Sequence, residues 1–182
     1  MARQAGIFMP ELTRTSGNMF VQKGPVLDST NSFKANALVT MTAGVLVLVA
    51  TAGVLVYGQT PDVQHTAAEA LTPPAALFGE NHYVFDLSGG VVTINVGALS
   101  SGALVTGADL PGLTPKTIAN VTLGSSYGIA TATSGAYTGF QVLDPTNTAN
   151  LLFTVVGFRD DVLTTDYNGR VLVKIVPATI QP

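Results

Sequence analysis

Three side chains that could bind a metal ion recur at helical spacing in the first half of the chain. Asp62, His65 and Glu69 stand at positions i, i+3 and i+7 of a segment that opens with Thr60-Pro61. Thr60 suits an N-cap and Pro61 the first helical turn, so the three side chains would share one helix face. Carboxylate oxygens and an imidazole nitrogen are ordinary metal ligands. Because no cysteine or second histidine lies nearby, a solvated helix face is the simpler interpretation.

A second acidic group lies towards the carboxyl end. Asp160, Asp161 and Asp166 are followed by Asn168, and several oxygen ligands at loop spacing are what calcium requires. The pattern of a calcium-binding loop is absent, however. The alternative interpretation is that these residues carry charge at the rim of a hairpin.

No arrangement typical of a catalytic site appears. His82 is the only other histidine, and it stands at the expected start of a strand, where a surface position is the simpler interpretation. The chain has no cysteine, which excludes disulfides, thiolate catalysis and cysteine-ligated metals. Neither a phosphate-binding loop, nor a dinucleotide fingerprint, nor a recognisable Ser-His-Asp spacing is present. The sequence therefore predicts a protein that is not an enzyme and holds no cofactor.

Charge is scarce throughout the chain. Charged residues make up 10% of the sequence, where about 25% is typical. The net charge of −3 and the scattered basic residues give no reason to expect nucleic-acid binding. Uncharged residues must cover much of the exterior, and such a surface suits burial against neighbouring proteins. We therefore expect a homo-oligomer, with a trimer as the leading choice.

The longest uncharged apolar stretch spans residues 37–58. It is long enough for a membrane helix, and that alternative follows from hydropathy alone. Its content favours strands instead, because Val and Thr dominate and residues 42–47 return unchanged as residues 51–56. We expect a buried β-meander with turns at Gly44 and Gly53, each a type I turn closed by a glycine in the left-handed region.

The rest of the chain adds one short helix and further strands. The helix is expected over 61–71, and loops with one short strand over 97–116. Asn168-Gly169 is the strongest hairpin signal. The other expected strands are 83–87, 91–96, 117–123, 127–133, 138–143, 151–158 and 170–176. The predicted fold is mainly β: an antiparallel β-sandwich or barrel with one short helix and an extended N-terminal arm.

Residues 1–36 differ from the remainder and are predicted to form that arm. No strand or helix period lasts there, yet large apolar side chains punctuate the segment. A loose terminus is the alternative, but solvated tails are poor in aromatic residues. We expect residues 37–182 to fold as a single β domain, with the arm docked on a partner. The partner-binding residues predicted in the arm are Phe8, Met19, Phe20, Val21 and Phe33.

The chain combines an arm that carries the spaced Phe8, Phe20 and Phe33 with a Thr/Gly/Val-rich β domain, little charge and no cysteine. This combination resembles the small decoration, or cement, proteins of tailed-bacteriophage heads. The resemblance implies a virion protein, made in the host cytoplasm, that sits on the capsid exterior and clamps neighbouring major capsid subunits through residues 1–36. It implies a homo-oligomer, often a trimer, with no nucleic acid or membrane as partner. The helix at 61–71 and the loop at 97–116 depart from the family pattern.

Other functions remain open at this point. A tail or neck subunit of a phage is the nearest variant. A secreted or surface-anchored β-rich adhesion module also fits the composition, although no secretory signal is visible. An enzyme or metal-binding domain would depend on the Asp62, His65 and Glu69 set.

Overall fold

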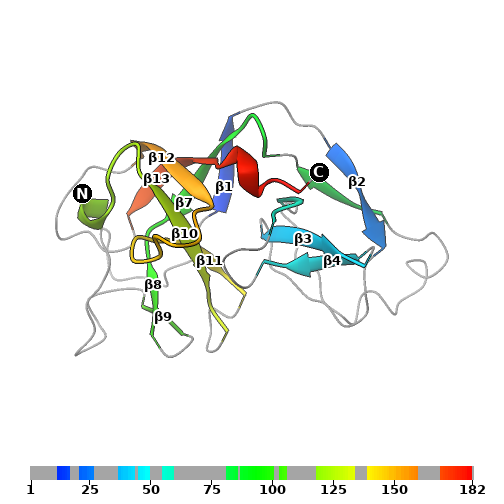
Figure 1. Ribbon diagram of the computed structural model, residues 1–182, viewed down its shortest axis with the longest axis horizontal. Helices are drawn as coiled ribbons and strands as arrows, with labels where there is room; N and C mark the ends of the chain where they lie inside the picture. The colour runs from blue at the N-terminus through cyan, green and yellow to red at the C-terminus, as the bar shows by residue number, and fades with distance from the viewer. Residues whose placement is uncertain are drawn as a thin grey trace.

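A computed structural model gives the fold of the chain (Figure 1). It describes residues 12–16, 21–26, 37–43, 45–49, 55–59, 81–85, 87–100, 103–105, 118–133, 139–159 and 169–181. The protein is mainly β, and its antiparallel sheets curl into a half-barrel, which confirms the predicted fold class. Within the described ranges, no helix is long and apolar enough to cross a bilayer.

The larger sheet has six strands, and every pair of neighbours in it is antiparallel. Their order is β1 (Leu12–Ser16), β7 (Val91–Asn95), β13 (Arg170–Ile175), β12 (Phe153–Phe158), β10 (Ser126–Thr131) and β11 (Gln141–Asp144). The sheet curls until β11 meets the residues that follow β7. There Val96 forms a parallel bridge with Leu143, and the Gly97 N–H donates to the Leu143 carbonyl at 2.9 Å.

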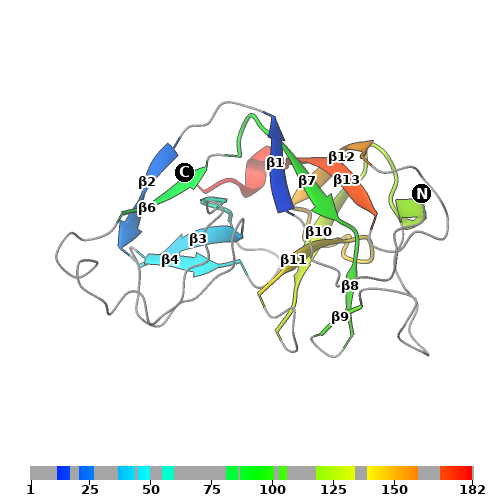
Figure 2. The same ribbon diagram turned by 180° about the vertical axis from the view of Figure 1, so that it is seen from behind.

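The second sheet has five strands and lies beside the first along the long axis of the molecule (Figures 1 and 2). Their order is β2 (Val21–Val26), β6 (Asn81–Phe85), β5 (Gly58–Gln59), β3 (Leu38–Thr42) and β4 (Val45–Leu48). A two-stranded hairpin of β8 (Ala98–Ser100) and β9 (Ala103–Val105) continues from β7. Two short 3₁₀ helices complete the described elements: η2 (Ile118–Asn120) and η3 (Pro177–Thr179).

The segment predicted as an arm supplies an edge strand to each sheet. β1 pairs with β7, and β2 pairs with β6. Each of the two strands has a register irregularity. In β2 it lies between Lys23 and Val26, where Pro25 has no N–H to donate. The middle of the arm therefore lies on the sheets of its own chain. Whether residues 37–182 fold without it stays a prediction.

The first hairpin of the apolar stretch is confirmed, but its turn differs from the prediction. β3 and β4 pair with Thr42 opposite Val45, which leaves a two-residue loop. The left-handed conformation falls on Ala43, with φ of 50°. A type I turn closed by a left-handed glycine is therefore wrong here, because a two-residue hairpin loop needs positive φ at its first residue. The helix expected at 61–71 and the turn expected at Gly53 lie outside the described residues.

Two other expectations need correction. The segment 117–123, predicted as a strand, contains η2, where the Val121 N–H donates to the Ile118 carbonyl at 3.0 Å. Ile118 and Val121 are both buried, three residues apart, which is the period of a 3₁₀ turn and not of a strand. The region 97–116 contains two short strands, β8 and β9, where one was expected. The strands expected near 83–87, 91–96, 127–133, 138–143, 151–158 and 170–176 are present with shifted ends.

One hydrophobic core runs beneath both sheets. Side chains of the six-stranded sheet, such as Ile94, Phe153 and Val173, are fully buried in it. Leu38 of β3 and Val56, which precedes β5, belong to the same cluster. A smaller cluster of Ala37, Val39 and Leu46 lies under the β3–β4 hairpin, and a third of Ala130, Ala132 and Val142 lies in the β10–β11 hairpin.

Candidate functional site

Most of the residues that could do chemistry lie outside the described part of the chain. This group comprises Asp62, His65, Glu69, Asp160, Asp161, Asp166 and Asn168. His82 lies within β6, in line with its expected place in a strand. In the part of the chain that the structure describes, no three His, Asp or Glu side chains gather closely enough to hold a metal ion.

The predicted partner-binding residues of the arm are placed only in part. Val21 opens β2, where its backbone pairs with Phe85 of β6. The other four lie outside the described residues: Phe8, Met19, Phe20 and Phe33. The backbone of Val21 is therefore tied to this chain's own sheet, and the partner-binding role of the other four stays a prediction.

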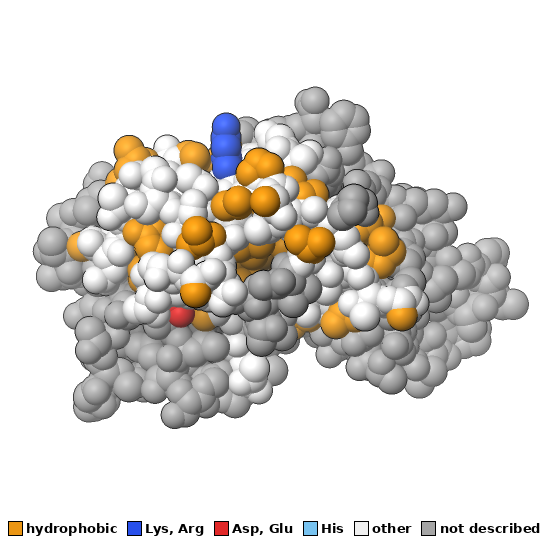
Figure 3. Space-filling model, in the orientation of Figure 1, with side chains coloured by type: hydrophobic (Ala, Val, Ile, Leu, Met, Phe, Trp, Pro, Cys, Tyr) orange, Lys and Arg blue, Asp and Glu red, His pale blue; other side chains and the backbone are white. Residues whose placement is uncertain are grey.

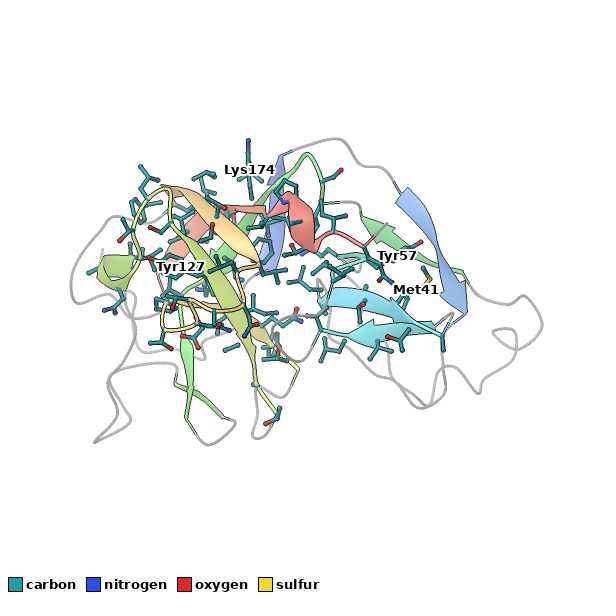
Figure 4. The ribbon with its side chains drawn as sticks, in the orientation of Figure 1. Met41, Tyr57, Tyr127 and Lys174 are labelled. Carbon is teal, nitrogen blue, oxygen red and sulfur yellow. The ribbon has the colours of Figure 1, made fainter. Side chains whose placement is uncertain are left out.

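Charge is rare on the surface as well as in the sequence. Of the side chains that the structure describes, four are charged: Asp144, Arg159, Arg170 and Lys174. The Asp144 carboxylate accepts hydrogen bonds from the Thr146 N–H (2.9 Å) and hydroxyl (2.6 Å), which closes a turn through Pro145. Arg159 donates from Nη1 to the buried Thr93 hydroxyl at 3.0 Å. Lys174 points away from the body of the six-stranded sheet (Figure 4).

Large apolar side chains are exposed on and next to β12, the strand that pairs with β13 and its Lys174. Leu123 is 57% exposed and Val156 is 42% exposed. Leu123 lies against β12, since the next residue, Gly124, donates its N–H to the Val155 carbonyl at 2.8 Å. Val156 sits where β12 shifts register against β13, and Leu172 packs over the adjacent Gly157. We call the surface of Leu123, Val156, Leu172 and Lys174 the β12–β13 face; on this side of the molecule, orange apolar side chains lie among uncharged ones (Figure 3).

The buried polar residues join the two sheets. Gln141 of β11 accepts the Leu38 N–H at Oε1 (2.7 Å) and donates from Nε2 to the Val49 carbonyl (2.8 Å). The Thr131 hydroxyl of β10 donates to the same Val49 carbonyl at 3.0 Å. Both side chains are almost wholly buried, so these bonds satisfy backbone groups that water cannot reach. Their role is structural.

A second glutamine works in the same way at the chain's end. Gln181 accepts the Met41 N–H at Oε1 (2.9 Å) and donates from Nε2 to the Met41 carbonyl (3.0 Å). Sequence reasoning missed Gln141 and Gln181, because a lone glutamine carries no local pattern and its partners lie more than ninety residues away.

Comparison with models of protein families, with curated proteins and with solved structures found no match to this chain. The chemistry of the described surface must therefore be read from its own groups. Those groups are aliphatic side chains, hydroxyls and amides with few charges, on a hydrogen-bonded β scaffold. Such a surface can bind another protein by burying its aliphatic side chains and by forming hydrogen bonds through its hydroxyls and amides.

Proposed function

We propose that the protein is a virion structural protein that binds the outside of a phage capsid as a homo-oligomer and stabilises it by bridging major capsid subunits. The observation that carries the proposal is the β12–β13 face, where Leu123 and Val156 are exposed and the charges are Lys174 and, at the border, Arg159, which bonds Thr93 beside Leu172. Protein interfaces lose charged residues at their centre because burying an unpaired charge is costly. A face with this composition is suited to close contact with another subunit.

The scaffold supports the same proposal. Antiparallel sheets over a shared core hold the face rigidly, so little ordering entropy is lost when a partner binds. A cement protein acts by remaining in place under load, which requires rigidity and area, not reactive groups. The proposed location is the capsid exterior.

The arm is the second contact of this proposal. β1 and β2 fasten parts of the arm to the sheets. We place the capsid contacts at the apolar residues beside these strands: Phe8, Met19, Phe20 and Phe33, with Val21 at the start of β2. Aromatic anchors of this kind bury large areas in a partner's grooves.

The direct test is binding to empty heads assembled, without this chain, from the major capsid protein of the phage whose genome would encode it. Purified protein is mixed with the heads and separated on a density gradient. We expect the protein to sediment with heads at a fixed ratio, and Leu123→Asp to weaken binding at least about tenfold, or ~1.4 kcal/mol.

Thr42→Asp is the matched control, because Thr42 is also exposed but lies on the β3–β4 hairpin of the other sheet. It should bind as the wild type does. Equal loss in both variants would show that any added acid weakens binding and that the β12–β13 face is not the contact. Wild-type protein that stays at the top of the gradient would overturn the proposal.

A further inference from the structure

The five-stranded sheet is split next to β3. β3 and β5 pair through Leu38 with Gln59 and Val39 with Gly58. Two residues further along β3, the same register would place Met41 opposite Val56. That pair does not form. Val56 instead forms a parallel bridge with Ile180, near the end of the chain. Met41 and Tyr57 mark the region of this split in Figure 4.

The C-terminal segment, residues 177–181, bonds both sides of the split. On one side, the Val56 N–H donates to the Thr179 carbonyl at 2.7 Å, and the Gln181 N–H donates to the Val56 carbonyl at 2.8 Å. On the other side, the Gln181 amide bonds both the N–H and the carbonyl of Met41. The Thr40 hydroxyl also reaches Gln181 Oε1 at 3.2 Å. The segment thus takes the place of a missing strand.

The segment is built to dock as a preformed unit. Pro177 has a fixed φ, and Thr179 bonds back to the Val176 carbonyl through its N–H (2.9 Å) and its hydroxyl (2.7 Å). Ile180 is half-buried and packs against the main core. The segment follows the last strand, β13, so it can leave the split without withdrawing any strand from either sheet.

We propose that the split between Met41 and Val56 is a binding site for an uncharged peptide carrying a glutamine, and that the C-terminal segment of another copy of this chain can occupy it in place of the chain's own segment. The two residues offer two N–H donors and two carbonyl acceptors, the pattern by which a sheet recognises an added strand. Glutamine is selected because its amide both accepts and donates, whereas a glutamate at the same place offers no donor to the Met41 carbonyl. The inference is independent of capsid binding.

The test uses the full-length chain and a fluorescent peptide of residues 175–182. In wild-type protein the attached segment competes at high effective concentration, so the peptide binds weakly. In Gln181→Glu the attached segment is a poor occupant, and the peptide should bind at least tenfold more tightly than to wild type. A peptide with glutamate in place of its glutamine should bind Gln181→Glu at least tenfold more weakly. Equal affinity of the two peptides, or no gain in the variant, would overturn the proposal.

Amide hydrogen exchange on the wild-type chain gives a second measurement, which remains informative even if the Gln181→Glu variant does not fold. The N–H groups of Met41, Val56 and Gln181 should exchange at one common rate, faster than that of Ile94 in the core. Excess unlabelled peptide should slow the exchange of Met41 and Val56. Exchange of all three at the rate of Ile94 would mean that the segment leaves only when the whole protein unfolds, which contradicts the proposal.

Discussion

The Gln141 amide stands in the β3–β4 ladder between Leu38 and Val49. The Leu38 N–H donates to Gln141 Oε1, and Gln141 Nε2 donates to the Val49 carbonyl, so one side chain replaces a direct backbone bond between the two residues. The reverse bond of the ladder is direct, from the Val49 N–H to the Leu38 carbonyl at 3.0 Å. A side chain of the six-stranded sheet thereby extends the hydrogen-bonded edge of the five-stranded sheet.

A double-mutant cycle tests this junction. Gln141→Leu leaves the Leu38 N–H buried without its acceptor, and should lower the free energy of unfolding by about 1–3 kcal/mol. Thr131→Val removes one of the two donors to the Val49 carbonyl, and should cost about 1 kcal/mol. Because the double variant leaves that carbonyl with neither donor, its loss should exceed the sum by about 1 kcal/mol. Urea unfolding of the four proteins measures each value. Additive losses, or a Gln141→Leu variant as stable as the wild type, would show that the ladder closes directly when the amide is gone.

The turn of the first hairpin gives a stabilising variant. Ala43 has φ of 50°, a conformation that costs a non-glycine residue roughly 1–2 kcal/mol. Ala43→Gly should raise the free energy of unfolding by about 0.5–1 kcal/mol, after the greater freedom of glycine in the unfolded chain is allowed for. Ala130→Gly is the matched control, because Ala130 is buried in β10 and φ there is not positive. Ala130→Gly should be destabilising. If both variants shift the urea midpoint in the same direction, the strain assigned to Ala43 is contradicted.

The same hairpin shows what the sequence could and could not predict. Its strands follow from Val and Thr content and from the glycine repeat, which are local properties. The placing of positive φ on Ala43, one residue before Gly44, depends on the pairing of Thr42 with Val45, and composition does not reveal a register. The second copy of the repeat ends at Val56, which pairs with Ile180. The same local sequence therefore pairs with a different segment of the chain in each copy.

The residues that join the two sheets could not be predicted from the local sequence either, because their partners are distant in the chain. Gln141 and Gln181 are ordinary polar residues in sequence, and each becomes informative only when it meets Leu38 or Met41. Ile118 and Val121 did carry a signal, an apolar spacing of three, but in a Thr-rich segment it was outweighed by strand propensity. The metal candidates Asp62, His65 and Glu69 stay a prediction.

Glycine is required at one position in the six-stranded sheet. A Cβ on Gly128 would lie 2.6 Å from the Asn150 carbonyl oxygen and would also meet the Asn147 amide. Gly128→Ala should lower the free energy of unfolding by about 1–3 kcal/mol, since backbone must shift to admit the methyl group. Gly89→Ala is the control, because that Cβ meets nothing within 4 Å, and its effect should stay within about 0.5 kcal/mol. Chemical denaturation of both variants checks the difference, and a Gly128→Ala protein as stable as Gly89→Ala would show that the loop moves freely.

Two nested truncations test how much each part of the arm contributes to the stability of the fold. Removing residues 1–11 spares β1 and β2, and should leave the thermal transition unchanged. Removing residues 1–34 deletes the partners of β7 and β6, and should cost roughly 2–5 kcal/mol of stability through lost backbone hydrogen bonds. The shorter protein should still fold, because side chains between Leu38 and Ile175 form one continuous hydrophobic core. Circular dichroism measures both, and an unfolded second truncation would place the domain boundary before residue 36.

The thermal rupture of DNA-filled heads tests the central proposal most directly. Heads lacking this protein are heated alone and with saturating protein, in the presence of a DNA dye that cannot cross the intact shell. Because a ligand that bridges subunits binds only the assembled shell, it should raise the temperature at which the dye gains access by several degrees. Leu123→Asp should give a smaller rise at the same concentration, and Thr42→Asp the full rise. Rupture of bare and protein-saturated heads at the same temperature, with the protein bound, would show that it occupies the capsid without cementing it and would contradict the proposed function.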